Sequence, residues 1–403
     1  MTLFQVVSRW LLVVGMLIEA SAVLMAGQSP GEKRYGGVLL SEWQQRLGDL
    51  DPKSPQAESV VDPLIDIVND VDLPSTTRRM FAVTLGRIGP RATQAIPVMV
   101  DKVQRRHDLH DESYVWAARA LGLYGIHAKP AVPVLIDLLF DESIPQGFRQ
   151  LSLETLAQVG TAHPAVMPAL IRLLEYQPPA ASQLTAADAS VLREYAAETL
   201  TIIGQEAYFA APLLVRVVRN SAETENVRFK AIVALGAIGG GAAVAIPALT
   251  ETMEFEPSPV LRDAAAEALP KIGPAAIPVL RRYLQHERVE LRRLAAEGLR
   301  EMGQGAGVAV VDLIRCLGSD QEDLPRIACC EALHGMGIDA SRYVKPLLGL
   351  LASPDRQVRM RAMRLLVTIG PQLGPHLETL QRMQDDGRPH VRAIVRKTLQ
   401  KIE

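Results

Sequence analysis

The densest group of side chains that could bind a metal ion lies at residues 107–112, in the sequence HDLHDE. It contains two imidazoles, from His107 and His110, and three carboxylates, and both groups are ligands for divalent metals. Their spacing matches no motif in which a helix holds the ligands in place. We therefore expect a polar loop between two helices and keep His107 and His110 only as weak candidates for a metal site.

Three cysteines, Cys316, Cys329 and Cys330, offer a second kind of chemistry. Cys329 and Cys330 occupy positions that are alanines in other copies of a repeat described below, so we expect them to be packed small residues. A disulfide between Cys316 and this pair is geometrically conceivable, although an odd number of cysteines leaves one thiol over. The sequence has no C-x-x-C pair, which argues against a thiolate zinc site.

Sequence motifs for catalysis and cofactor binding are sparse. The chain has no H-E-x-x-H zinc motif and no G-x-x-x-x-G-K-[ST] phosphate loop. The glycine run from Gly303 to Gly307 follows a predicted helix rather than a strand, so it does not fit a dinucleotide-binding loop. We therefore expect no enzymatic activity, no catalytic residue and no cofactor.

A row of charged residues follows the prolines that begin the second helix of each predicted helix pair. Four residues past these prolines the chain carries Asp101, Asp137, Arg172, Arg216, Glu251 and Arg282. Second helices usually line the concave face of stacked helix pairs, so we expect the row to form a groove that binds a protein or peptide of complementary charge. The alternative is that these are ordinary solvated side chains.

The composition argues against a nucleic-acid partner. The formal net charge is −2, and only 4% of the residues are aromatic. Proteins that bind nucleic acids usually present a basic stripe and aromatic side chains for stacking. The 48% of apolar residues instead fits a stack of helices rich in alanine, leucine, isoleucine and valine.

A repeat along most of the chain positions these side chains. In its clearest copy, from Val227 to Pro247, apolar residues recur at helical spacing, a glycine run at Gly239 stops the helix, and Pro247 begins the next one. The copies lie 30 to 44 residues apart when they are aligned on the stop glycines Gly89, Gly125, Gly160, Gly204, Gly239, Gly273, Gly303, Gly337 and Gly370. Glu403 stands in the glycine position of a tenth copy.

Two further columns recur in this alignment. A leucine stands four residues before the stop in all ten copies, and an arginine stands eleven before it in nine of them. Such regularity indicates a role in the repeat itself, so we expect each arginine to lay its stem over the adjacent repeat and place its head near acidic loop residues. Small residues seven and eight before the stop allow close stacking. The periodicity predicts an all-α solenoid.

The pattern VR..AA.ALG.IG followed by A-I-P, as in Val227-Arg228 through Gly236 to Pro247, resembles the HEAT repeat. It is similar to the short variety found in phycobilisome-lyase subunits, and the resemblance covers residues 74–403. It implies a right-handed α-solenoid of about nine to ten helix pairs, a scaffold or adaptor that binds a protein or peptide. One alternative is a subunit of an enzyme complex that attaches a cofactor, and a second is a metal-binding module. The resemblance transfers no catalytic residue.

The first segment lies outside the repeat. Arg9 precedes an apolar run from Trp10 to Ile18, and Ala20-Ser21-Ala22 has the small residues of a signal-peptide cleavage site. We therefore expect export to the periplasm or another extracytoplasmic space. An uncleaved anchor at residues 10–26 is the alternative, and it would be the protein's only link to a membrane.

These observations predict three segments. Residues 1–27 are the signal peptide or anchor, and residues 28–73 form a linker and an irregular cap repeat. Residues 74–403 form the solenoid, in which one spacing of 44 residues marks an insertion at 176–190. We expect this insertion to be an extended loop that contacts the partner; the alternative is a tolerated insertion.

Overall fold

The structure is a computed structural model that describes residues 32–107, 113–159, 163–178, 184–370, 373 and 376–402. The predicted signal segment lies outside these residues. The described chain is helical apart from one antiparallel hairpin of β1 (Arg34–Tyr35) and β2 (Val38–Leu39). The chain divides into two compact units, Met1–Val134 and Leu135–Glu403.

The first unit starts with the hairpin and an irregular helix pair. Gly36 and Gly37 form the hairpin turn with φ values of 54° and 79°, which suit glycine at both central residues of a tight turn. The helices α2 (Leu40–Asp49) and α3 (Val61–Asn69) follow, with the 3-10 helix η1 (Pro55–Val60) between them. Trp43 is buried, and its Nε1 donates to the Tyr35 carbonyl at 2.9 Å, so it ties α2 to the hairpin.

Each full repeat has a first helix, a turn and a second helix, as predicted. The first helices are α4 (Ser75–Ile88), α6 (Ser113–Leu123), α8 (Gln146–Val159), α10 (Ala186–Ile203), α12 (Glu225–Ile238), α14 (Pro259–Ile272), α16 (Val289–Met302), α18 (Asp323–Gly335), α20 (Arg356–Ile369) and α22 (Pro389–Ile402). The second helices are α5 (Ile96–Gln104), α7 (Val132–Phe140), α9 (Val166–Leu174), α11 (Ala211–Arg219), α13 (Ile246–Phe255), α15 (Ile277–Tyr283), α17 (Val310–Ser319), α19 (Val344–Leu350) and α21 (Leu377–Arg382).

Most turns are short 3-10 helices that start at or just after the stop glycine. Five are seven residues long: η2 (Gly89–Ala95), η3 (Gly125–Ala131), η4 (Gly204–Ala210), η5 (Gly239–Ala245) and η7 (Gly303–Ala309). The described repeats also contain η6 (Pro274–Ala276), η8 (Ala340–Arg342) and η10 (Met383–Asp385). A proline stands in the first two positions of α5, α11, α13 and α15, where its missing N–H costs no hydrogen bond.

The described stop glycines adopt a backbone conformation that other residues avoid, with φ values of 50–89°. Gly160 and the tenth position, Glu403, lie outside the described residues. Gly204 has φ 65° and ψ −128°, and Gly239 has φ 65° and ψ −133°. The positive φ confirms that glycine ends these helices. The ψ value differs from that of the left-handed helical cap on which many helices end, for which ψ is about +47°, because the chain leaves directly into a 3-10 turn. A side chain at this combination of angles would clash with the backbone.

The leucine column forms a repeated core. All ten of its members are buried, with exposed fractions of 0–5%. Burial of one leucine side chain contributes about 1.5–3 kcal/mol. Each repeat therefore brings its own part of the core, and stability is distributed along the stack.

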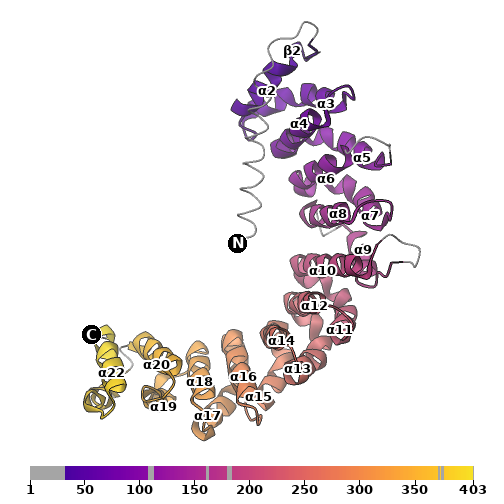
Figure 1. Ribbon diagram of the computed structural model, residues 1–403. Coiled ribbons are helices and arrows are strands. Elements are labelled where there is room, and N and C mark those ends of the chain that lie inside the picture. Colours follow the sequence, from indigo (N-terminus) through magenta and orange to yellow (C-terminus); the bar gives the residue numbers. More distant parts are fainter. Residues whose placement is uncertain are drawn as a thin grey trace. The chain divides into compact units, whose positions relative to one another are not determined.

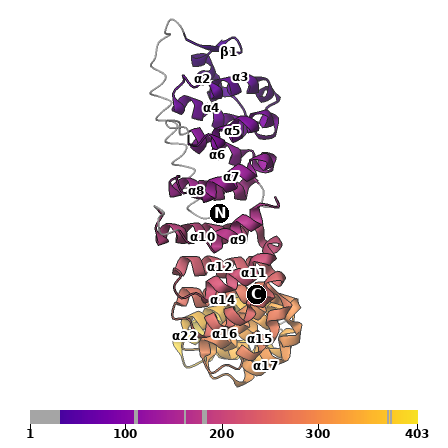
Figure 2. The same cartoon turned by 90° about the vertical axis from the view of Figure 1, so that its right-hand side faces the viewer.

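Within the second unit, the first helices lie on the inner side of a curve and the second helices on the outer side (Figure 1). Figure 2 shows the pairs as successive layers, with α9 beside α10 and α11 beside α12. The predicted placement was the reverse. Successive first helices such as α10 and α12 pack directly on one another, whereas successive second helices scarcely touch.

The alanine positions explain this curvature. Ala196 and Ala197 of α10, and Ala265 of α14, are fully buried. Without longer side chains between them, the first helices approach more closely than the second helices, so their side of the stack is shorter and becomes the inner one. The prediction failed because it applied the usual placement of second helices on the concave face and did not consider how closely the alanine-rich first helices can pack.

Three column arginines hold successive repeats together. In each, the guanidinium donates to a backbone carbonyl before its own helix and pairs with a carboxylate of the loop after the next second helix. We call this arrangement an arginine clamp. The clamps are Arg193 with the Tyr176 carbonyl and Glu223, Arg228 with the Val218 carbonyl and Glu256, and Arg292 with the His286 carbonyl and Asp320. The predicted contact between the arginine head and acidic loop residues is confirmed at these positions.

Arg149 belongs to the same column but has no clamp. It is 0% exposed, and its Nε donates to the Asp141 carbonyl at 3.0 Å. Its Nη1 and Nη2 have no hydrogen-bond partner among the described residues. The insertion follows its second helix; residues 179–183 lie outside the described chain, and the predicted loop is shorter than expected, because α10 already begins at Ala186.

Two stretches, Ala186–Arg219 and Glu225–Phe255, are long and apolar enough to cross a membrane by composition alone. Each consists of a first helix, a glycine-led turn and a second helix. Leucines such as Leu200 and Leu235 within them are buried in the repeat core. Their apolar character is thus explained by the solenoid.

Candidate functional site

The predicted second-helix row does not line an inner groove in the second unit. Asp137, Arg172, Arg216, Glu251 and Arg282 lie on α7, α9, α11, α13 and α15, on the outer side (Figure 1). Asp101 lies on α5 of the first unit, where it pairs at 3.1 Å with Arg105, the residue that follows the helix. The predicted concave position is therefore wrong for the second unit, and a role of the row in binding stays a prediction.

Several side chains of this row contact the neighbouring outer helix. Arg216 pairs with Glu175 at 3.1 Å, and Glu251 pairs with Arg219 at 3.1 Å. The Arg172 guanidinium lies 3.8 Å from the centroid of the Phe140 ring. These side chains are largely exposed, so each ion pair contributes about 0–1 kcal/mol. Their contacts are those of an ordinary solvated surface.

Another column, six residues before each stop glycine, faces the inner side of the second unit. It is exposed or half-buried on every first helix there, because it points away from the second helices. From α8 to α22 the column reads Glu154, Glu198, Val233, Glu267, Glu297, Glu331, Arg364 and Lys397. Residues four positions earlier lie on the same helix face, and they add Glu194 on α10 and Asp263 on α14.

Five of these residues form what we call the acidic patch: Glu154, Glu194, Glu198, Asp263 and Glu267. Within the described chain, only Glu198 of the five has an ion pair, with Lys230 at 3.3 Å. Glu154 accepts a hydrogen bond from Gln150 Nε2 at 3.2 Å. Most of the negative charge of the patch is therefore uncompensated, and it attracts cations at this part of the inner face.

Aromatic and apolar side chains lie among the carboxylates. Tyr195 on α10 is half-buried and hydrogen-bonded to Gln150. Burial raises the pKa of Tyr195, and the nearby charges of Glu154, Glu198 and Glu194 raise it further. On α12, the half-buried Phe229 and Val233 take the two positions that carry carboxylates on α10 and α14. The patch is thus an acidic rim around an apolar centre.

The inner face changes character beyond the patch. Arg361 on α20 pairs with Glu331 on α18 at 2.7 Å and with Glu297 on α16 at 3.2 Å. Arg293 also pairs with Glu297, at 2.6 Å. These glutamates already have cationic partners within the protein. Among the described carboxylates of this face, those of the acidic patch are the ones whose negative charge is mostly open to a partner.

A cavity of about 520 Å³ lies at the loop between α15 and α16 and is lined by Glu254, Arg282, Tyr283, Gln285, His286 and Glu287. Tyr283 Oη donates to Glu254 at 2.5 Å. This hydrogen bond lowers the pKa of Glu254, while burial and the carboxylate raise the pKa of Tyr283 to about 12. The Arg288 N–H donates to His286 Nδ1 at 3.0 Å, which leaves Nε2 facing Glu254 at 3.4 Å. These groups satisfy one another.

The weak metal candidates are not brought together with other ligands in the part of the chain that the structure describes. His107 follows α5 and is exposed, and His110 lies outside the described residues. No group of three or more His, Cys, Asp or Glu side chains there could hold a metal ion. Cys329 and Cys330 are fully buried in α18, which confirms that they are packed small residues.

The family model for HEAT repeats matches residues 177–270 and 246–334. No curated protein matches the chain. Among solved structures, the karyopherin Kap121p bound to the SUMO protease Ulp1p aligns at 12% identity and a TM-score of 0.56, over 88% of this chain and 42% of that one. Kap121p bound to RanGTP aligns at 13% identity and a TM-score of 0.55, over 89% and 42%.

This chain therefore spans less than half the length of the karyopherin it matches, and at such identity the likeness shows the fold alone. The complex of CpcE and CpcF of phycocyanin lyase from Nostoc sp. PCC7120 aligns at 22% identity over 68% of this chain and 94% of that one. Its TM-score is 0.35, too low to carry an argument.

Proposed function

We propose that this HEAT-repeat solenoid is an exported, non-enzymatic scaffold that binds a protein or peptide on the inner face of its second unit. The observation that supports this proposal most directly is the acidic patch with its apolar centre. Stacked repeats provide an extended surface of this kind, on which many weak contacts add up. Solenoids of HEAT repeats are typical protein-binding scaffolds.

The partner that fits the patch presents basic side chains on both sides of an apolar one. Lysine or arginine side chains would pair with Glu194 and Glu198 on α10 and with Glu267 on α14. Phe229 and Val233 on α12 would receive the apolar side chain between them, where water is displaced. Because all of the patch carboxylates except the half-buried Glu194 are exposed, association would be fast and would weaken as salt is added.

Charge reversal tests the binding face. Tagged wild type and the variant Glu198→Lys/Glu267→Lys are used to capture partners from the envelope fraction of the producing cells. The double reversal on the outer side, Asp137→Lys/Glu251→Lys, is the matched control. We expect one recurring partner with wild type and control, and at least about tenfold weaker binding to the inner variant, which corresponds to about 1.4 kcal/mol.

Equal recovery of the partner by the inner variant would remove the inner face from the proposal. Far-UV circular dichroism of both variants confirms that they are folded. The export part of the proposal rests on residues 10–22 of the sequence alone. Its test is the intact mass of the protein in the envelope fraction and in the cytoplasmic fraction. A chain that retains residues 1–22 and is found in the cytoplasm would contradict export.

A further inference from the structure

The turns that join first helices to second helices form one edge of the stack, between its inner and outer sides. On the neighbouring turns η4 and η5 this edge carries a cluster of exposed apolar side chains. Their exposed fractions are 62% for Ile202 at the end of α10, 46% for Tyr208 and 67% for Phe209 on η4, and 54% for Val244 on η5. Apolar side chains that gather on a surface mark a contact site, whereas isolated ones need no explanation.

The two rings project from this edge as a pair. The ring centroids of Tyr208 and Phe209 are 3.9 Å apart, and the ring planes are inclined by 33°. Tyr208 lies against Gly241 of η5, where an added Cβ would come within 2.6 Å of Tyr208 Cβ. A glycine at position 241 thus makes room for the base of the ring pair. We call Tyr208 and Phe209 the aromatic knob.

The edge is lower at the next turn but one. The turn η5 contacts both η4 and η6, so η6 lies one layer beyond η5. The turns η4 and η5 have seven residues each, whereas η6 has three and therefore projects less from the ends of its helices. Its Pro274 and Ala275 are exposed. We call this shorter, apolar part of the edge the step.

Opposite charges flank this stretch. Glu206 lies on η4 beside the aromatic knob, and Lys271 lies in the last turn of α14 beside the step. Both are exposed, and within the described chain neither has an ion pair. The turn η5 between them consists of glycine, alanine and valine. One end of the edge thus carries an acid and a knob, and the other end carries a base and a step.

We propose that this edge binds the same edge of a second copy of the chain, in a dimer whose twofold axis passes through η5. A twofold axis reverses the order of the turns, so η4 of each copy faces η6 of the other. The aromatic knob of one copy fills the step of the other, and Glu206 pairs with Lys271 of the second copy. Each of these contacts is made twice.

A lipid surface fits this edge less well than a second copy does. Segments that lie on membranes usually combine apolar side chains with Lys and Arg that attract anionic lipids, whereas here Glu206 stands beside the aromatic knob. The edge also lies apart from the acidic patch, which faces the inner side (Figure 1). The dimer therefore leaves the patch accessible, and the proposal does not rest on the proposed function.

Sedimentation equilibrium of the purified protein tests the dimer. Because interfaces of moderate size can have micromolar dissociation constants, the concentration is raised to about 0.2 mM. We expect the mass to rise from that of one chain toward that of two. Phe209→Asp places a charge in both apolar contacts and should raise the dissociation constant at least about tenfold.

Phe255→Asp is the matched control. Phe255 is 72% exposed at the end of α13, and α13 begins at the turns, so this phenylalanine lies on the opposite edge of the stack. The same substitution there should leave the dimer unchanged. Circular dichroism shows that both variants are folded.

A charge exchange identifies the second copy as the partner. Glu206→Lys and Lys271→Glu each bring like charges together at both contacts, so each variant alone should dimerise about tenfold more weakly. An equimolar mixture of the two variants should dimerise like wild type, because opposite charges then meet at both contacts.

Several outcomes overturn the proposal: the mass of one chain at the highest concentration, equal weakening by Phe209→Asp and Phe255→Asp, or a mixture that dimerises no better than its components. Binding to phosphatidylcholine vesicles that Phe209→Asp abolishes, without a dimer in solution, would instead assign this edge to a membrane.

Discussion

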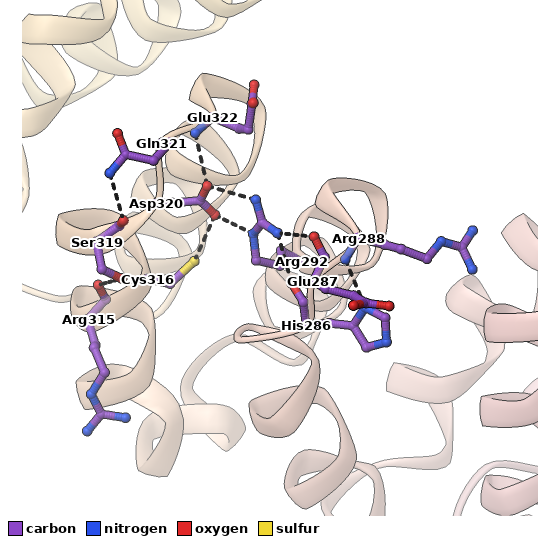
Figure 3. A network of polar contacts seen from close by, with 10 residues as sticks. All are labelled: His286, Glu287, Arg288, Arg292, Arg315, Cys316, Ser319, Asp320, Gln321 and Glu322. Atoms are coloured by element: carbon purple, nitrogen blue, oxygen red, sulfur yellow. Dashed lines mark hydrogen bonds and ion pairs between the residues drawn. The ribbon is translucent and has the colours of Figure 1, made fainter.

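Arg149 and Arg292 occupy the same position in two repeats of the second unit, yet their surroundings differ. Arg292 donates to two carbonyls of the preceding loop, those of His286 and Glu287, and pairs with Asp320. Arg149 is buried at least as deeply, but only its Nε has a partner among the described residues. The same residue is therefore a clamp in one repeat (Figure 3), and in the other a buried cation without an ion pair among the described residues. Its charge still acts on Asp188, whose pKa is lowered by hydrogen bonds with Thr185 and also by Arg149.

The loop that follows explains the difference. The clamp partners stand 28 residues after Arg292 and Arg228 and 30 residues after Arg193. At these two spacings after Arg149 the chain has Gln177 and Pro179, neither of which is acidic. Burying a charge without a partner lowers the stability of the fold. An ion pair with satisfied hydrogen bonds offsets this desolvation cost. A residue that recurs at one position of a repeat thus performs a recurring function only where its partner recurs as well.

The largest effect is expected from breaking a clamp. Arg292→Met leaves the Asp320 carboxylate, whose side chain is 3% exposed, without its cation, so the free energy of unfolding should fall by about 3 kcal/mol. Urea denaturation followed by circular dichroism measures it. Arg149→Met is the matched control and should cost less than about 1 kcal/mol, because it removes one hydrogen bond together with an unpaired charge. Equal losses would contradict the comparison.

A second effect should appear in acid. Burial opposes ionisation of Asp320, but Arg292 holds its pKa below the usual value, and Arg228 does the same for Glu256. Carboxyls of lowered pKa stabilise the fold above their unfolded pKa of about 4 and lose this contribution as the pH falls through the folded pKa. Wild type should therefore weaken below pH about 4, and its advantage over Arg292→Met should shrink. An advantage that stays constant from neutral pH downward would refute this account.

The smallest effect is expected from giving Arg149 the carboxylate that the clamp arginines have. Gln177→Glu places a carboxylate at the spacing of the Arg228 and Arg292 clamps, and its pairing with Arg149 should raise the free energy of unfolding by about 1 kcal/mol. The same substitution in the Arg149→Met background should gain nothing, which isolates the pair in a double-mutant cycle. A gain of equal size in both backgrounds would show that Arg149 is not the partner.

The repeat was predictable because its signals are local. Each of its signals, the leucine column, the stop glycine and the proline at the start of a helix, depends on about one turn of chain. Among the described residues, the leucines are buried and the glycines end their helices as expected. The ψ angle of the glycines was not predictable from the same signals, because the 3-10 turn that follows sets it. The inner side was missed although the alanine positions carried the information, since curvature depends on spacing between helices far apart in the sequence.

The candidate site was missed for a related reason. The second-helix row was predicted to bind because the second helices were expected on the concave side. The glutamates of the acidic patch recur in the same alignment, but on the first helices. A residue six before the stop lies opposite the buried helix face, so Glu198 and Glu267 could have been identified as exposed. The surroundings of Arg149 were not predictable from the repeat, because they depend on the insertion that follows its second helix.

The glycine-led turns also bear on how such a chain can change its length. Turns such as η4 and η5 have the same number of residues and enter the next helix at an alanine boundary. Loss or duplication of one stretch from Gly204 to Ile238 would rejoin equivalent ends and restore the same neighbours. Deletion of one residue within a turn would instead rotate the following helix by about 100° and expose its apolar side. Gain or loss of whole repeats should therefore disturb the packing of the solenoid much less than insertion or deletion of single residues.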